Sequence, residues 1–111
     1  MYDNQELVLP QQPTMKDFQN YVRDLVRVRG WQDQKIQEVF MLFLEECGEL
    51  AKAVRKTSGM EFDKNSTAYH ADLEAADVLI YLLDICNRCG IDLEKAFRDK
   101  EEINKKRVWS K

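Results

Sequence analysis

The sequence predicts an all-α fold, a four-helix antiparallel bundle completed by further copies of the same chain. Four segments carry apolar residues at three- and four-residue steps, which is the period of a helix with one buried face. No segment shows the alternation of a half-buried strand. The connections are short, which favours antiparallel packing of neighbouring helices. With 111 residues the chain suits one domain, and we expect an irregular segment at 1–13 followed by a helical domain at 14–111.

The first helix is predicted from Thr14 to about Arg29. Thr14 is a good N-cap, and Asp17 three residues later completes a pattern similar to a capping box. Gly30 fits the position after the C-cap. The apolar residues with helical spacing are Phe18, Tyr21, Val22, Leu25, Val26 and Val28.

The second helix is predicted to be capped by Asp33 and to run to about Lys56. Its apolar residues recur at three- and four-residue steps: Ile36, Val39, Phe40, Phe43, Leu44, Cys47, Leu50, Ala51 and Val54. Residues 57–66, TSGMEFDKNS, are a loop by composition.

A third helix is predicted over about 67–89, ended by Gly90, and a fourth from a cap at Asp92 to about Arg107. The third helix is apolar around most of its circumference. Its polar residues fall in one stripe: His70, Glu74, Asp77, Tyr81, Asp84 and Arg88. A helix apolar on most sides is surrounded by other helices, whereas each helix of one small bundle keeps a solvent face. The third helix therefore predicts a homo-oligomer, a dimer or a tetramer.

The composition is that of an ordinary globular protein, with 44% hydrophobic and 33% charged residues. The net charge of -3 gives no electrostatic reason to expect nucleic acid or an anionic membrane as a partner. No stretch is long and apolar enough to span a bilayer. Residues 1–13 lack the basic start and the apolar region of a signal peptide, so the expected location is cytoplasmic.

The three cysteines are Cys47, Cys86 and Cys89, an odd count that fits a reducing compartment. The last two form a C-x-x-C pattern. Redox versions of this pattern usually begin a helix, whereas this one ends a helix. A zinc site would need a fourth ligand, and His70 is the only histidine. We therefore expect buried core cysteines.

Acidic residues at helical spacing are the main candidates for chemistry. Glu45, Glu46 and Glu49 share one face of the second helix, and Glu74 and Asp77 are three residues apart on the third. If the two helices are neighbours, their carboxylates meet and repel unless a cation binds them. Carboxylate-only sites favour Mg²⁺, Ca²⁺ and Mn²⁺.

A solvated acidic face is the alternative interpretation of the second helix. Glutamate-rich helices often have such faces, with Lys52 and Arg55 or Lys56 as partners here. This interpretation stays open for residues 45–49 taken alone. The two acids of the apolar third helix favour the cation site, because an ionised carboxylate is costly to bury without compensation.

The order and spacing of the acids resemble a known family. E-E-x-x-E at 45–49 is followed by E-x-x-D at 74–77, and the segments LEECGELAKAVRK, DLEAADVLIYLLDI, GIDLEKAF and KEEINKKRVW lie around and after them. This pattern resembles the MazG-like, all-α nucleoside triphosphate pyrophosphohydrolases over about residues 18–109. The resemblance implies hydrolysis of a nucleoside triphosphate to the monophosphate and pyrophosphate with Mg²⁺, with Mn²⁺ as a possible substitute. It makes residues 14–111 a MazG-like domain.

The resemblance also implies roles for particular residues. The metal ligands would be Glu46, Glu49, Glu74 and Asp77. Glu45 would lie beside them and help to orient or deprotonate the attacking water. On the last helix, Lys100, Asn104 and Arg107 match a K-x-x-x-N-x-x-R stretch that resembles a phosphate-contacting element. The sequence departs from many relatives after that arginine, where Val108 and Trp109 replace a frequent proline.

The base of the nucleotide needs an aromatic partner. Trp31 is the best candidate for stacking, and packing at a corner between helices is its equally weighted alternative; Phe62, Tyr69 and Tyr81 are weaker candidates. Lys35 and Lys56 are candidate polar contacts, although simple surface solvation is favoured for each. His70 is favoured as a helix-start residue over a catalyst.

The sequence therefore predicts a homo-oligomeric, Mg²⁺-dependent nucleotide pyrophosphohydrolase that clears unwanted nucleotides from the cytoplasm. The alternative from another class is a non-catalytic helical module that binds metal or nucleotide for regulation or assembles with partners. The presence of acids at all four ligand positions favours the enzyme.

Overall fold

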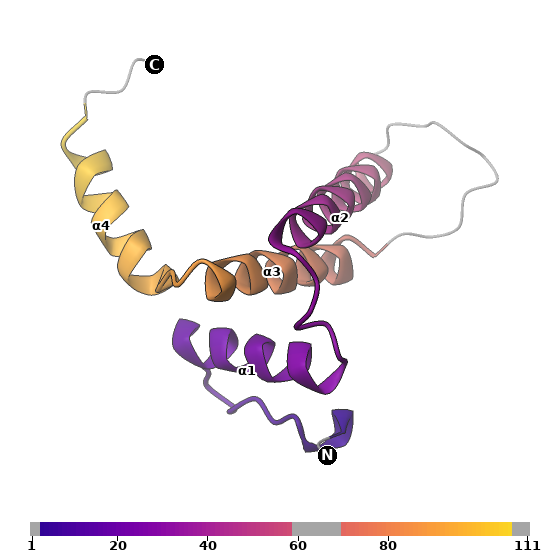
Figure 1. The fold of residues 1–111 in the computed structure, drawn as a ribbon. Helices are drawn as coiled ribbons and strands as arrows, with labels where there is room; N and C mark the ends of the chain where they lie inside the picture. Colours follow the sequence, from indigo (N-terminus) through magenta and orange to yellow (C-terminus); the bar gives the residue numbers. More distant parts are fainter. Residues whose placement is uncertain (1–2, 59–69, 108–111) are drawn as a thin grey trace. The chain divides into compact units, whose positions relative to one another are not determined.

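The computed structural model describes residues 3–58 and 70–107. They form a short 3-10 helix, η1 (Asn4–Glu6), and four α-helices: α1 (Met15–Val28), α2 (Ile36–Thr57), α3 (Ala71–Arg88) and α4 (Leu93–Lys105) (Figure 1). The described residues contain no strand, so the predicted all-α fold is confirmed. Among these described residues, no helix has the length and apolar character needed to cross a membrane.

The chain divides into two compact units. Unit 1 combines Met1–Gln32 with Cys86–Lys111, and unit 2 is Asp33–Ile85. Unit 1 contains α1, the end of α3 and α4, and within it α1 and α4 are in contact. Unit 2 contains α2 and most of α3.

The start of α1 is fixed by a capping box, as the sequence predicts. The Thr14 hydroxyl accepts from the Asp17 backbone N–H at 3.1 Å, and the Thr14 N–H donates to the Asp17 carboxylate at 2.9 Å. These two bonds satisfy donors that the first helical turn leaves unpaired. The helix then buries Val22, Leu25 and Val26.

Glycines end α1 and α3 in the predicted way. Gly30 has φ 73° and Gly90 has φ 68°, both in the left-handed region. After α3, the Gly90 N–H donates to the Asn87 carbonyl at 3.3 Å and the Ile91 N–H donates to the Cys86 carbonyl at 2.8 Å. This pair of bonds is a Schellman motif, which turns the chain sharply at the end of α3.

Replacing Gly90 with alanine should therefore lower the free energy of unfolding by about 1–2 kcal/mol, the cost of a left-handed backbone for a residue with a Cβ. No atom lies within 4 Å of the added Cβ, so the cost comes from the backbone alone. Gly48, in the middle of α2, is the matched control. Its Cβ also meets nothing within 4 Å, so Gly48→Ala should stabilise by about 0.5–1 kcal/mol. Urea unfolding in the presence of a chelator measures both, and equal effects of the two substitutions would contradict this assignment.

Two helix boundaries differ from the prediction. Asp33 lies in a turn and does not cap α2; the N-cap is Lys35, which makes no side-chain capping bond. The predicted start of the third helix at 67 lies outside the described residues, and the described part begins at Ala71. α4 ends at Lys105 instead of Arg107, because the backbone N–H groups of the two residues after it bond three residues back, at 3.2 and 3.1 Å. Such bonds tighten the last turn and close the helix.

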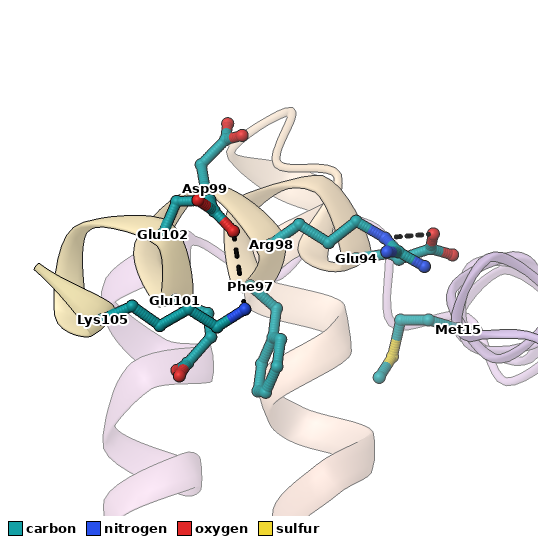
Figure 2. A pocket seen from close by; sticks show the side chains of 8 residues that line it. All are labelled: Met15, Glu94, Phe97, Arg98, Asp99, Glu101, Glu102 and Lys105. Carbon is teal, nitrogen blue, oxygen red and sulfur yellow. Dashed lines mark hydrogen bonds and ion pairs between the residues drawn. The ribbon is translucent and has the colours of Figure 1, made fainter.

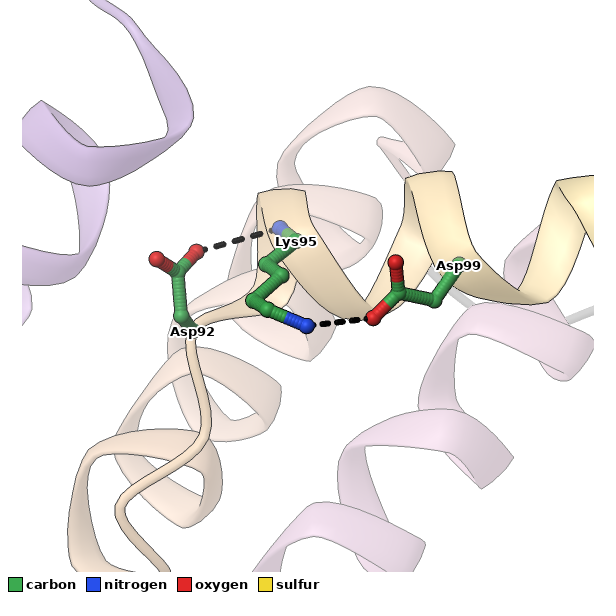
Figure 3. A network of polar contacts seen from close by, with 3 residues as sticks. All are labelled: Asp92, Lys95 and Asp99. Atoms are coloured by element: carbon green, nitrogen blue, oxygen red, sulfur yellow. Dashed lines mark hydrogen bonds and ion pairs between the residues drawn. The ribbon is translucent and has the colours of Figure 1, made fainter.

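The start of α4 matches the prediction. The Asp92 side chain accepts from the Lys95 backbone N–H at 3.1 Å, which is an N-cap bond. The Lys95 ammonium reaches along the helix to the Asp99 carboxylate at 2.6 Å (Figure 3). This ion pair raises the pKa of Lys95, first through the hydrogen bond and then through the charge of Asp99. Both side chains are exposed, so the pair contributes little stability.

The apolar residues of α2 are not all buried. Val39 and Ala53 are fully buried, whereas Phe40, Leu44 and Val54 are 46%, 56% and 50% exposed. Within the single chain, the predicted apolar stripe of α2 is therefore only partly buried. The acidic Glu46 is half-buried, so the inward side of α2 includes an acid and its exposed side includes large apolar residues.

Candidate functional site

Three carboxylates from two helices of unit 2 come together. One carboxylate oxygen from each of Glu46, Glu74 and Asp77 lies within 4.8 Å of the others. Glu46 is on α2, and the other two are three residues apart on α3, a spacing that puts them on one face. Glu46 and Glu74 are half-buried and Asp77 is exposed. The juxtaposition joins residues that are about 30 positions apart in the sequence.

The electrostatics of the cluster are unfavourable in the absence of a cation. The pKa of Glu46 is raised above its ordinary value of 4.5, first by burial and then by the negative charges of Asp77, Glu74, Glu49 and Glu45. The like charges disfavour ionisation of Glu46. A divalent cation would reverse this effect, because it attracts the ionised form.

Tyr81 belongs to the surroundings of the same cluster. Its pKa is raised, first by burial and then by the charges of Glu46 and Asp77, followed by Glu45 and Asp84. Tyr81 is one helical turn after Asp77, so both point from the same side of α3. The sequence places Tyr81 in the same polar stripe of the third helix as Glu74 and Asp77, and the role expected of it was weak base stacking. Its i, i+4 spacing from Asp77 was the signal for a place beside the acids.

The donor set fits a hard divalent cation. Carboxylate oxygens are the ligands that Mg²⁺, Ca²⁺ and Mn²⁺ prefer. Among residues 3–58 and 70–107, no other group of three His, Cys, Asp or Glu side chains comes as close together. The cysteines and His70 therefore do not assemble a zinc site in the described part of the chain.

Comparison with known proteins identifies the family. The model of the MazG nucleotide pyrophosphohydrolase domain matches residues 34–108. The chain belongs to this MazG family. The matched range contains the whole of α2, α3 and α4, and all three carboxylates of the cluster.

Curated relatives of the MazG chain carry names of nucleotide-hydrolysing enzymes. The dCTP pyrophosphatase 1 of Homo sapiens is 32% identical over 101 residues, which cover 86% of this chain and 59% of that protein. The dATP/dGTP diphosphohydrolase of cyanophage S-2L is 38% identical over 68 residues, 61% of this chain and 52% of that protein. The dATP/dGTP diphosphohydrolase of Salmonella phage PMBT28 is 34% identical over 85 residues, 76% of this chain and 26% of that protein. The chain thus spans between a quarter and three fifths of the length of these relatives.

The predicted acids that are outside the group of three are Glu45 and Glu49. Both are exposed on α2, and both raise the pKa of Glu46 through their charges. They therefore lie within electrostatic reach of the cluster. The role of Glu49 as a fourth ligand of the MazG site and that of Glu45 beside the attacking water stay predictions.

The predicted substrate-binding residues are divided between the two units. Lys35, at the start of α2, and Lys56, in its last turn, belong to unit 2 with the acids. Trp31 belongs to unit 1, where the Arg29 guanidinium lies 5.4 Å from the centroid of its half-buried ring. The remaining predicted residues of unit 1 are Lys100 and Asn104 on α4 and Arg107 just after it. Phe62 and Tyr69 lie outside the described residues.

The cysteines are structurally unequal. Cys86 is buried, Cys47 is half-buried and Cys89 is exposed; none forms a disulfide. The prediction of core cysteines is therefore right for Cys86 and wrong for Cys89, which follows the last residue of α3 and faces solvent. Burial is the main cause that raises the pKa of the Cys86 thiol, and the neighbouring Cys89 raises it further. A redox C-x-x-C needs a thiol with a lowered pKa, whereas the pKa of Cys86 is shifted in the opposite direction.

Alkylation should distinguish these thiols. The thiolate is the reactive species, and Cys86 combines 3% exposure with a raised pKa. With iodoacetamide at neutral pH, Cys89 should therefore react at least about tenfold faster than Cys86 in the folded protein. Mass spectrometry of the peptides over time measures both rates. Denaturant should remove most of the difference, whereas equal rates in the native protein would contradict the burial of Cys86.

A surface hollow of about 540 Å³ lies in unit 1 between the start of α1 and one side of α4 (Figure 2). Its lining residues are Met15, Glu94, Phe97, Arg98, Asp99, Glu101, Glu102 and Lys105. Arg98 pairs with Glu94 at 3.1 Å and Lys105 pairs with Glu102 at 3.7 Å. The lining therefore contains four carboxylates and two cationic side chains, and both cations are already paired. Because its net charge is negative, this hollow would repel a polyphosphate. It is thus a weaker candidate for a nucleotide site than the acidic cluster.

Proposed function

We propose that this chain hydrolyses nucleoside triphosphates, deoxynucleotides included, to the monophosphate and pyrophosphate, with Mg²⁺ as its cofactor and Mn²⁺ as a substitute. The observation that carries the proposal is the convergence of Glu46, Glu74 and Asp77 within 4.8 Å in a chain of the MazG family. The names of the relatives support a role in clearing nucleotides from the cellular pool.

The acids would hold the metal, with Glu46, Glu74 and Asp77 as ligands and Glu49 as the fourth. When bound, the cation would clamp phosphate oxygens and lower the pKa of bound water. Glu45 would accept a hydrogen bond from the attacking water and take up its proton. Because water is the nucleophile in this proposal, the reaction does not need a serine or cysteine activated by a histidine.

The remaining predicted residues would hold the nucleotide. Lys100, Asn104 and Arg107 would contact phosphate oxygens, where arginine offers two parallel N–H donors. Lys35 and Lys56 would supply further polar contacts from unit 2. Trp31 would stack on the base through the indole face that Arg29 leaves open, since a π-cation contact occupies one face.

We further propose that the chain works as a homodimer or homotetramer in the cytoplasm. The support is the exposed apolar surface of α2: Phe40, Met41, Leu44 and Val54 are between 46% and 70% exposed in the single chain. Contiguous apolar surface of this kind is typical of association between subunits. The net charge of -3 gives no electrostatic reason to propose nucleic acid or an anionic membrane as a partner.

The test is turnover of a panel of canonical, deoxy and modified nucleoside triphosphates by the purified protein with Mg²⁺, followed by pyrophosphate release. Release with at least one triphosphate, lost on adding a chelator, is the expected result. A folded protein that binds Mg²⁺ or nucleotide but hydrolyses no triphosphate would favour the non-catalytic helical module.

A further inference from the structure

A set of hydrogen bonds in unit 1 joins the parts of the chain that the proposed function assigns to the nucleotide. It consists of Gln19 on α1, Asn87 and Arg88 at the end of α3, and the backbone of Trp31, Ile91 and Leu93. We call this set the polar corner. The residues it connects are separated by 57 to 74 positions in the sequence.

Gln19 is the centre of the polar corner. Its side-chain amide donates to the Asn87 side-chain oxygen at 2.9 Å and to the Ile91 carbonyl at 2.9 Å. Its side-chain oxygen accepts from the Leu93 N–H at 3.0 Å. Asn87 returns a bond by donating to the Gln19 carbonyl at 2.8 Å. Gln19 is only 5% exposed, so both amide hydrogens and the acceptor are used in a place where unpaired groups would be costly.

Within unit 1, these bonds hold the turn that follows the last residues of α3 and the first residue of α4. Ile91 is in the turn between the two helices, and Leu93 is the first residue of α4. The Leu93 N–H is one of the donors that the first helical turn leaves without a partner inside the helix. Gln19 supplies that partner from α1, so the first residue of α4 is attached to α1 as well as to α3.

Arg88 extends the polar corner to Trp31. Its guanidinium donates to the Trp31 carbonyl at 2.9 Å. The Trp31 N–H in turn donates to the Val26 carbonyl at 2.8 Å, and Arg29 lies over the indole ring. The backbone and ring of Trp31 are thus held by groups from the ends of α1 and α3.

We propose that Gln19 and Arg88 are positioning residues for the nucleotide. The polar corner holds Trp31 and the first turn of α4 in one rigid frame, so that the base-stacking group and the phosphate-contacting helix are placed before substrate binds. This inference rests on the proposed function. Its physical basis is that misplacement of contact groups by about 1 Å can greatly reduce the benefit of binding.

The test compares Gln19→Met and Arg88→Met with the wild type, using the triphosphate that the wild type hydrolyses fastest. Both substitutions keep a long side chain and remove the hydrogen bonds. Exposed residues provide matched controls: Gln12→Met, and Arg23→Met on α1. We expect KM to rise about tenfold in both corner variants, the cost of a lost buried hydrogen bond, with kcat within about threefold of the wild type. Arg88→Lys keeps an N–H donor, so its KM should lie between the KM of Arg88→Met and that of the wild type.

The readouts separate positioning from simple stabilisation. Assays run well below the Tm of each variant, and the increase in Tm on adding Mg²⁺ should be the same as in the wild type, because the acids belong to unit 2. A folded Arg88→Met with unchanged KM would overturn the proposal, even where Gln19→Met fails to fold. A wild type that hydrolyses no triphosphate would contradict the proposed function alone. Equilibrium binding of dATP then replaces KM, and equal binding by wild type and Arg88→Met would overturn the inference.

Discussion

Asp77→Asn should remove most of the stabilisation that Mg²⁺ gives to this protein and most of its hydrolytic activity. Asparagine has nearly the same shape, but it lacks the charge that attracts a hard cation. A ligand that binds only the folded state stabilises it by mass action, by about 2.7 kcal/mol at a hundred times its dissociation constant. In a chain of 111 residues this corresponds to an increase in Tm on the order of 10 °C. The variant should lose this increase, and kcat/KM should fall by at least about 100-fold.

The metal-free forms give the opposite comparison. In a chelator, Asp77→Asn should be as stable as the wild type or slightly more stable, because one of the repelling charges around Glu46 is gone. Differential scanning fluorimetry with and without Mg²⁺ measures both quantities. Asp24→Asn, on an exposed part of α1, is the control and should keep the response to Mg²⁺. A metal-free Asp77→Asn that is strongly destabilised would assign Asp77 a structural hydrogen bond or ion pair instead.

Glu46→Gln should make the metal-free protein more stable at neutral pH and remove the pH dependence that Glu46 causes. The pKa of Glu46 is higher in the folded protein than its ordinary value of 4.5, because of burial and of the charges around it. The folded state therefore binds this proton more tightly than the unfolded state. The stability that Glu46 contributes is fully present below the unfolded pKa and is lost as the pH rises through the raised folded value. Glutamine resembles the protonated acid at every pH.

The measurement is the Tm difference, Glu46→Gln minus wild type, in a chelator at about pH 4.5 and about pH 7.5. The difference should be more positive at the higher pH, where the wild type has to ionise its carboxylate beside Glu74 and Asp77. With saturating Mg²⁺ at the higher pH the sign should reverse, because the variant lacks a ligand. Glu38→Gln, in the exposed first turn of α2, should show neither effect. A difference that does not change with pH would contradict the electrostatic coupling of Glu46 to the other acids.

Local signals in the sequence were sufficient for the helix ends. The capping pair Thr14 and Asp17, and the glycines that follow α1 and α3, act within a few residues, so their structure follows from local chemistry. Asp33 is a residue type that often caps helices, but it does not cap α2. It lies in a turn, and the N-cap is Lys35, two residues later. Residue preference alone does not decide which of several neighbouring positions begins a helix.

The candidate site was predictable in part. The i, i+3 pair Glu74 and Asp77 follows from helix periodicity, whereas the meeting with Glu46 depends on how α2 packs on α3 in unit 2. Periodicity also did not show which apolar residues of α2 the single chain buries, because they surround much of the helix and only packing chooses between them. The polar corner gave no sequence signal, since Gln19 and Asn87 are ordinary polar residues 68 positions apart.

Phosphorus NMR of the products tests most directly that the acidic cluster serves a nucleotide pyrophosphohydrolase. The wild-type protein with Mg²⁺ should convert a nucleoside triphosphate into the monophosphate and pyrophosphate, and Asp77→Asn under the same conditions should leave the triphosphate essentially intact. Formation of a diphosphate and inorganic phosphate, or pyrophosphate release that persists undiminished in Asp77→Asn, would contradict the account.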